Sequence, residues 1–249
     1  MKRDELRQNT YDQFADQYDE YLRQMEQETF SFYHHLVVPY LLRYVGDVAG
    51  LSVLDAGCGE GSVSRLLTER GARITGIDIS PRLVQLAQAR DPQSTITYQV
   101  HDLSQPLPKY EQTFDVVVSN LVLNDVPDYR GFIATLGSMT KPDGRLVLSL
   151  NNPYSAVIRD KVQNYFDSGT VTLYNMARDG VEVYYFHRTL EEYMTAFRDA
   201  GFLLRSLADV QVTTEIAARL PDRYSHLPYS HRYHHFPFFM ILELIKSSG

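Results

Sequence analysis

Apolar and polar positions in the middle of the chain follow two alternating patterns. Near-continuous apolar runs, typical of buried strands, are separated by segments in which apolar residues recur every three or four positions, as on one face of a helix. The predicted strands are 51–55, 73–78, 95–100, 114–119 and 145–150, and the predicted helices between them are 62–70, 81–89 and 129–139. Strands that are apolar on both faces and alternate with helices predict a parallel sheet buried between helical layers.

The two ends of the chain show other patterns. Residues 4–45 carry apolar and aromatic positions at roughly helical spacing among charged neighbours, which predicts two or three helices. Residues 151–186 mix Asn, Tyr, Gly and Asp with weak periodicity, and the stretch is too long for an ordinary loop. We therefore expect a partly helical insertion there that acts as a lid.

The chain returns to regular structure after this insertion. Residues 189–200 predict a helix, with Thr189 as N-cap, Glu192 at capping-box spacing and Gly201 as the stop. The last two predicted strands are 202–212 and 236–245.

Together these patterns predict one α/β domain over residues 1–249. We expect a doubly wound, mostly parallel seven-stranded sheet with helices on both faces. A helical cap at residues 1–48 and a lid at residues 151–188 complete the predicted domain.

Composition and charge narrow the class of protein. The 249 residues are 44% hydrophobic and 22% charged, as in an ordinary globular protein. The net charge of −7 gives no overall attraction to a phosphate backbone, so a nucleic-acid partner is disfavoured. Cys58 is the single cysteine, which excludes an intrachain disulfide and fits a reducing cytoplasm. The polar N-terminus and the lack of a long apolar window predict neither export nor a membrane span.

A glycine-rich turn, VLDAGCGEG at residues 53–61, follows the first predicted strand. The strand ends at Asp55, and Gly57, Gly59 and Gly61 then occupy alternate positions before a helix. Glycines at such a place let the backbone turn sharply and approach a ligand closely. The dinucleotide fingerprint is G-x-G-x-x-G, whereas this run is G-x-G-x-G, so a nicotinamide cofactor fits less well.

This run resembles the first motif of the class I, or Rossmann-like, S-adenosylmethionine-dependent methyltransferases. Further motifs of that family follow in register at successive strand ends: Asp78 with Ile79, Asp102 with Leu103, and Asn120 with Leu121. KPDGRLVLSL, from Lys141, resembles the family's turn and fifth strand, and YDQFADQYDEY resembles its entry helix.

The resemblance implies a role in S-adenosylmethionine binding for each of these positions. Asp78 would accept hydrogen bonds from both ribose hydroxyls, Asp102 would contact the adenine amino group, and Leu103 would line the adenine ring. Asn120 and Leu121 would lie beside the sulfonium, and Tyr11 and Tyr18 would close over the methionine end. The alternatives are that Asp78 caps the next helix, that Asp102 belongs to a plain turn, and that the two tyrosines pack in a core.

The chain departs from the family pattern at two places. Asp143-Gly144 stands where relatives commonly carry two glycines, a change that a tight turn tolerates. Asn124 and Asp125 stand where many relatives have a pair of histidines, so no histidine role is implied there.

A second motif resembles one found in DNA methyltransferases but follows a different strand. The run Asn151-Asn152-Pro153-Tyr154 resembles the box with which DNA amino-methyltransferases hold a flipped base. In those enzymes the box follows the fourth strand, whereas here it follows the fifth. A nucleic-acid substrate is therefore disfavoured.

The acceptor side carries candidates but no specific motif. YYFHRTLEEY resembles a stretch of bacterial small-molecule methyltransferases, and His187 is the first choice for a catalytic base, with Arg188 also facing the acceptor. A structural hydrogen-bonding role is the alternative for His187. The second group of candidates consists of His226, His231, His234 and His235, and no metal site is expected there because Pro228 and Pro237 flank the segment. Further tyrosines that suit an aromatic wall are Tyr154, Tyr165, Tyr174, Tyr184 and Tyr185.

The sequence thus predicts a methyltransferase that uses S-adenosylmethionine and releases S-adenosylhomocysteine. The predicted partner is a small-molecule acceptor, methylated at oxygen or nitrogen, with carbon as a further option. One alternative is a protein of the same fold that binds the cofactor without methyl transfer, such as a cyclase or another modifying enzyme. Another is a nucleic-acid or protein methyltransferase. Nothing in the sequence sets the oligomeric state.

Overall fold

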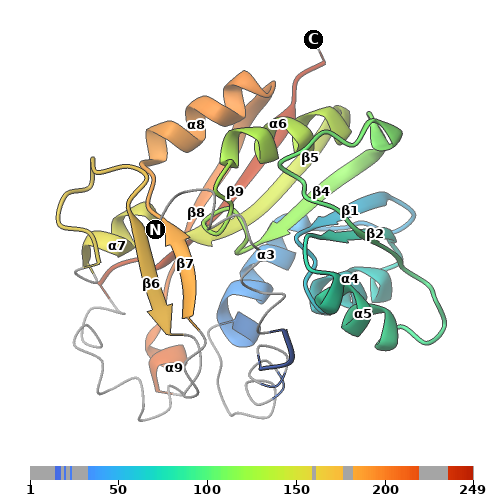
Figure 1. Cartoon of the computed structure of the whole chain (residues 1–249), viewed down its shortest axis with the longest axis horizontal. Coiled ribbons are helices and arrows are strands. Elements are labelled where there is room, and N and C mark those ends of the chain that lie inside the picture. The colour runs from blue at the N-terminus through green and yellow to red at the C-terminus, as the bar shows by residue number, and fades with distance from the viewer. Residues whose placement is uncertain are drawn as a thin grey trace.

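Helices and strands alternate along the chain in the computed structural model (Figure 1). The structure describes residues 15–17, 20, 23, 33–158, 161–175, 182–218 and 235–248. The strands are β1 (Ser52–Ala56), β2 (Arg73–Asp78), β3 (Thr97–Val100), β4 (Phe114–Asn120), β5 (Thr140–Asn151), β6 (Val171–Asn175), β7 (Glu182–Phe186), β8 (Phe202–Val210) and β9 (Phe239–Lys246). The helices are η2 (Tyr33–Val37), α3 (Val38–Val45), α4 (Ser62–Glu69), α5 (Pro81–Ala89), η3 (Pro108–Tyr110), α6 (Tyr129–Met139), α7 (Pro153–Ile158), α8 (Leu190–Asp199) and α9 (Thr214–Ala217).

The main sheet has seven strands in the order β3-β2-β1-β4-β5-β9-β8. The strands from β3 to β5 pair in parallel, and β9 runs antiparallel to both β5 and β8. The predicted doubly wound, mostly parallel seven-stranded sheet is therefore confirmed. The strand order reverses between β1 and β4, and ligands of such sheets bind beyond the carboxyl ends of the strands at that switch point.

Both faces of the sheet are buried because successive side chains of a strand point to opposite sides. Val53 of β1 joins a core formed with α3 and α4, whereas its neighbour Leu54 joins a second core formed with α6 and α8. Val116 and Val117 of β4 divide between the two cores in the same way. Figure 1 shows α6 and α8 together along one side of the sheet.

Capping side chains set the beginnings of the helices around the sheet. Ser80 accepts a hydrogen bond from the Leu83 N–H at the start of α5, and Asp128 accepts one from the Gly131 N–H at the start of α6. At the start of α8, Thr189 and Glu192 form both bonds of a capping box, so this predicted cap is confirmed.

The insertion differs in part from the prediction. It was expected to be partly helical, and α7 is a short helix, but β6 and β7 also pair there as an antiparallel two-stranded sheet. The two strands, VTLYN and EVYYF, are rich in β-branched and aromatic residues, which favour strands over helices. Among the described residues, no helix is both long and apolar enough to cross a membrane.

Candidate active site

The glycine turn leaves the carboxyl end of β1 with three left-handed residues: φ is +78° at Gly57, +54° at Gly59 and +84° at Gly61. A Cβ added to Gly57 would lie 2.4 Å from a Val122 methyl carbon, and one added to Gly61 would lie 2.4 Å from the Tyr98 hydroxyl oxygen. A Cβ at Gly59 would meet nothing within 4 Å. Packing therefore requires the outer two glycines, whereas Gly59 faces open space that a ligand can occupy.

Asp78 ends β2, beside the turn, and its carboxylate holds two backbone segments. Its Oδ2 accepts the Gly59 N–H at 2.9 Å, and its Oδ1 accepts the Ser80 N–H at 2.9 Å. The side chain that caps α5 is Ser80, so Asp78 does not serve as the helix cap that was its alternative role. A carboxylate oxygen can accept more than one hydrogen bond.

Asp55, at the end of β1, is 1% exposed and lies under the turn. The Ser64 hydroxyl donates to its Oδ2 at 2.6 Å. Burial raises the pKa of Asp55 to about 7, and the nearby negative charges of Asp78 and Glu60 act in the same direction. Near neutral pH this carboxyl is therefore divided between its charged and neutral forms.

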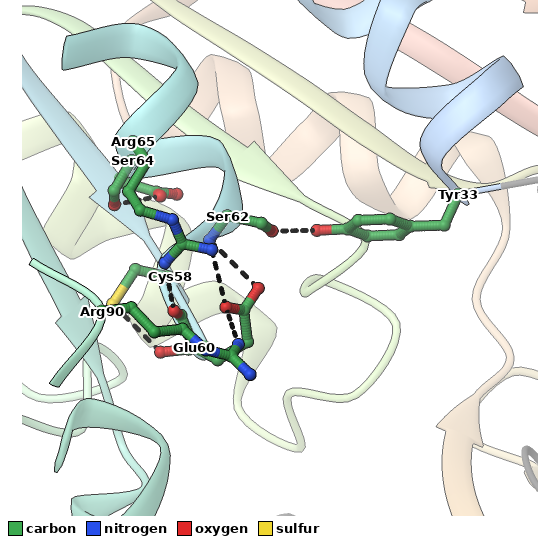
Figure 2. Close-up of polar contacts among 9 residues, drawn as sticks. Tyr33, Cys58, Glu60, Ser62, Ser64, Arg65 and Arg90 are labelled. Carbon is green, nitrogen blue, oxygen red and sulfur yellow. Dashed lines mark hydrogen bonds and ion pairs between the residues drawn. The ribbon is translucent and has the colours of Figure 1, made fainter. Parts of the chain in front are cut away.

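Glu60, inside the turn, is a buried anion that the sequence interpretation missed. Its carboxylate forms ion pairs with Arg65, at 2.9 Å, and with Arg90, and it accepts the Ser62 N–H at 3.1 Å (Figure 2). Burial acts to raise the pKa of Glu60, but the two guanidinium groups outweigh it and lower the pKa below its ordinary value. The side chain thus ties the turn to α4 and to the end of α5.

The carboxyl end of β4 holds a strained residue and an unsatisfied amide. Leu121 has φ +57°, which is unusual for a residue other than glycine and is typical of functional sites. Its neighbour Asn120 accepts a hydrogen bond from the Ser149 hydroxyl at its Oδ1, at 2.5 Å. The Asn120 Nδ2 is buried, and it has no hydrogen-bond partner of regular geometry among the residues that the structure describes. A buried donor of this kind is suited to an acceptor on a ligand.

Tyr33, from the N-terminal region, contacts the start of α4 beside the glycine turn. Its hydroxyl lies 3.1 Å from the Ser62 Oγ at the start of α4. Figure 2 shows the two side chains pointing toward each other. Burial raises the pKa of Tyr33 to about 12, although the hydrogen bond with Ser62 and the influence of the Asn120 amide act to lower it. The sequence interpretation assigned tyrosine closure to Tyr11 and Tyr18, which lie outside the described residues.

The remaining predicted cofactor residues follow β2 and β3. Asp102 accepts the Ser104 N–H at 2.9 Å and so closes a local turn with one oxygen. Leu103 is buried in the core beside α6, and Ile79 is 42% exposed. The His101 N–H donates to the Asp78 carbonyl at 2.9 Å, which holds the segment after β3 against the end of β2.

Arg188, which was expected to face the acceptor, is engaged by backbone carbonyls. It is buried, and its guanidinium donates to the carbonyls of Leu123, Val126 and Pro127 and stacks on the Tyr129 ring. The several N–H donors of arginine satisfy the carbonyls of the loop after β4. Arg188 therefore joins this loop to the end of β7.

His187 is also buried, and its Nε2 lies 2.7 Å from the Tyr165 carbonyl oxygen. A carbonyl can only accept, so the Nε2 carries the proton and the Nδ1 is the ring nitrogen with a free lone pair. The Tyr165 ring stacks on Tyr154, with centroids 4.8 Å apart.

Some of the other acceptor-side candidates have structural roles, and others lie outside the described residues. The Asn152 Oδ1 accepts the Tyr154 N–H, and the Asn152 Nδ2 donates to Asp209, so this part of the DNA-like box has a structural role. His235 is exposed, whereas His226, His231 and His234 lie outside the described residues. Tyr184 and Tyr185 are half-buried on β7, and the Tyr174 side chain is not described. In the described part of the chain, no group of three or more His, Cys, Asp or Glu side chains could hold a metal ion.

The chain is similar to known methyltransferases. Residues 54–148 match the family model of a methyltransferase domain. The ubiquinone biosynthesis O-methyltransferase of Coxiella burnetii is 35% identical over 147 residues, which is 55% of this chain and 62% of that protein. The demethylmenaquinone methyltransferase of Tropheryma whipplei is 36% identical over 107 residues, or 43% of this chain and 44% of that protein. The chain thus spans less than two thirds of the length of these relatives.

The fold has known counterparts over a longer stretch. The crystal structure of an S-adenosylmethionine dependent methyltransferase from Mesorhizobium loti has a TM-score of 0.65 and 24% identity, covering 83% of this chain and 96% of that one. The predicted resemblance to class I S-adenosylmethionine-dependent methyltransferases is therefore confirmed: residues 54–148 match the methyltransferase domain model, and the solved structure shows the same fold.

Proposed function

We propose that the protein transfers the methyl group of S-adenosylmethionine to a small-molecule acceptor. The observation that carries this proposal is the group of polar and open features at the sheet's switch point. The Asp78 carboxylate, the open space at Gly59 and the unsatisfied Asn120 amide belong to three neighbouring strand ends. This edge therefore suits a ligand with hydroxyl donors at one end and an oxygen acceptor at the other.

The residues proposed to hold the cofactor lie at or directly beyond the ends of β1 to β4. They are Asp55, Gly57, Gly59, Gly61, Asp78, Ile79, Asp102, Leu103, Asn120 and Leu121, with Tyr11 and Tyr18 expected to close over them. When bound, the cofactor supplies an electrophilic methyl group on a sulfonium. The chain then has to align donor and acceptor and exclude water.

The acceptor is proposed to be a small molecule that is methylated at oxygen or nitrogen, or otherwise at carbon. The names of the two relatives, one for ubiquinone biosynthesis and one for demethylmenaquinone, make phenols and quinols the first compounds to try. The single cysteine supports a reducing compartment such as the cytoplasm.

His187 is proposed as the base if the acceptor must lose a proton. Because its Nε2 is engaged by the Tyr165 carbonyl, the proton would go to the Nδ1. An amine with a free lone pair would need no such base, so the role of His187 depends on the acceptor.

The test is methyl transfer from S-adenosylmethionine labelled in its methyl group. The purified protein is incubated with a library of phenols, quinols and amines, and mass spectrometry follows the label. Labelled acceptor together with S-adenosylhomocysteine is the expected result. Cofactor binding without label transfer to any acceptor would favour a non-methylating protein of this fold. Label in added RNA or total protein would favour a macromolecular substrate.

A further inference from the structure

The Asn120 amide at the end of β4 is held by one hydroxyl from the neighbouring strand. Asn120 pairs with Ser149 in the parallel register of β4 and β5, so the two side chains share a face of the sheet. We propose that Ser149 is a positioning residue, which fixes Asn120 so that its Nδ2 donates to an oxygen atom of the bound ligand. This inference rests on the proposed function, because it concerns the same site.

The hydrogen bonds of Ser149 fix which way the amide points. The Leu121 N–H donates to the Ser149 Oγ at 3.0 Å, so this hydroxyl already accepts a backbone bond. Its single proton goes to the Asn120 Oδ1 at 2.5 Å. Since the oxygen of the amide faces Ser149, the nitrogen faces the opposite way. The Leu121 N–H also donates to the Ser149 carbonyl at 3.1 Å, so the turn at Leu121 has a second bond, whereas the Ser149 hydroxyl orients the Asn120 amide.

The free end of the amide determines the class of ligand atom. The Nδ2 carries two N–H donors and is buried, and within the described part of the chain it makes no hydrogen bond of regular geometry. A buried donor without an acceptor is costly, so a ligand oxygen that satisfies it contributes to affinity. An ammonium or sulfonium offers no acceptor. The matching group is a carboxylate, carbonyl or hydroxyl oxygen.

The position of Tyr33 agrees with this assignment. Its hydroxyl lies 3.1 Å from the Ser62 Oγ at the start of α4, and the Asn120 amide acts to lower the pKa of this phenol. Two polar groups, one from β4 and one from the N-terminal region, thus border the same place. The oxygen can belong to the cofactor or to the acceptor, and these two sources are separable by experiment.

The test is a double-mutant cycle between Ser149→Ala and Asn120→Ala, with S-adenosylhomocysteine binding measured by calorimetry. Ser149→Ala is expected to weaken binding about 10-fold, equivalent to about 1.4 kcal/mol. The same substitution should add nothing in the Asn120→Ala background, because the hydroxyl acts through the amide. If the oxygen belongs to the acceptor, S-adenosylhomocysteine affinity is unchanged and the KM for the acceptor rises by this factor instead.

Two further variants separate positioning from loss of stability. Thr140→Val is the matched control, because Thr140 is a buried hydroxyl at the other end of β5 that donates to the Leu136 carbonyl at 2.7 Å. This control should leave the S-adenosylhomocysteine affinity and the acceptor KM within about 2-fold of wild type, since it removes a comparable bond far from the site. Ser149→Cys keeps the shape with a weaker donor and should fall between wild type and Ser149→Ala.

Two results would overturn the inference. One is an unchanged cofactor affinity together with an unchanged acceptor KM in Ser149→Ala. The other is an equal loss in the wild-type and Asn120→Ala backgrounds. If the wild-type protein bound no S-adenosylhomocysteine, the proposed function itself would fail, and that outcome is distinct from both.

Discussion

Asp55 is a residue of the site whose buried carboxylate lowers the stability of the folded protein at neutral pH. It is buried at the end of β1, where the Ser64 hydroxyl donates a hydrogen bond to it at 2.6 Å. Burial raises its pKa to about 7, whereas an aspartate in an unfolded chain titrates near pH ~3.9. Between these values the folded chain holds one more proton than the unfolded chain. Stability therefore falls as the pH rises through this window, and the full cost is present above pH ~7.

Asp55→Asn removes this cost while retaining an oxygen that can accept the Ser64 bond. We expect the variant to have a higher Tm than wild type at pH 8 by several degrees and a similar Tm at pH 4, because each kcal/mol is worth about 2–4 °C in a chain of this size. Circular dichroism melts at pH 4, 6 and 8 provide the measurement. A Tm difference that did not vary with pH would contradict the burial argument.

His187 allows its two ring nitrogens to be tested separately. Gln places a donor near the position of Nε2 and can keep the bond to the Tyr165 carbonyl, but it has no proton acceptor at the Nδ1 position. If His187 is the base, His187→Gln lowers kcat by about 10²–10⁴-fold with little change in Tm.

His187→Asn is the companion variant, since its shorter side chain does not reach the Tyr165 carbonyl. It should lower the Tm as well as kcat. Near wild-type turnover in His187→Gln on an acceptor that must lose a proton would leave His187 with only its structural bond.

The residues found from sequence differ from those missed in how they depend on the fold. Asp78 and Asn120 stand at strand ends within local motifs, so their place at the switch point was predictable. The contacts of Ser149 with Asn120 and of Tyr33 with Ser62 each join residues 29 positions apart. No local pattern in the sequence marks such pairs, because they arise only when strands and helices pack together.

At the scale of elements, the glycine turn predicts two different effects for the same substitution. Gly61→Ala brings a Cβ to 2.4 Å from the Tyr98 hydroxyl oxygen in a left-handed residue, so we expect a marked loss of stability. Gly59→Ala meets no atom within 4 Å and bears only the left-handed strain, about 1–2 kcal/mol.

The two variants should therefore separate in binding and melting experiments. Gly59→Ala should remain folded yet lose affinity for S-adenosylhomocysteine, because its methyl group enters the open space beside the turn. Gly61→Ala should show the larger fall in Tm. An unchanged ligand affinity in folded Gly59→Ala would argue against a ligand at that place.

The boundaries of several elements were predicted closely because their capping residues are local. Residues 73–78, 81–89 and 129–139 are a strand and two helices with the predicted bounds. The structure of the insertion was harder to predict, because its strands β6 and β7 are short and pair with each other outside the main sheet. The Asp179-Gly180 pair between them is a turn signal that favours a hairpin.

At the scale of the whole molecule, the residues proposed for the donor and for the acceptor lie in different parts of the chain. The matched methyltransferase domain, residues 54–148, contains the glycine turn, Asp78 and Asn120. The insertion that contains His187 lies after it and is held to the loop following β4 through Arg188. The sequence therefore predicted the cofactor more closely than the acceptor, since the cofactor side is built from motifs at parallel strand ends.

Binding of S-adenosylmethionine to wild type and Asp78→Ala, measured by calorimetry, tests the central claim most directly. Asp128→Ala is the control, because this aspartate caps α6 through the Gly131 N–H. Two hydrogen bonds to a carboxylate, at about 1.5 kcal/mol each, predict a loss of about 100-fold for Asp78→Ala. The control should bind like wild type. Wild-type protein that does not bind S-adenosylmethionine, or Asp78→Ala that binds it with unchanged affinity, would contradict the account.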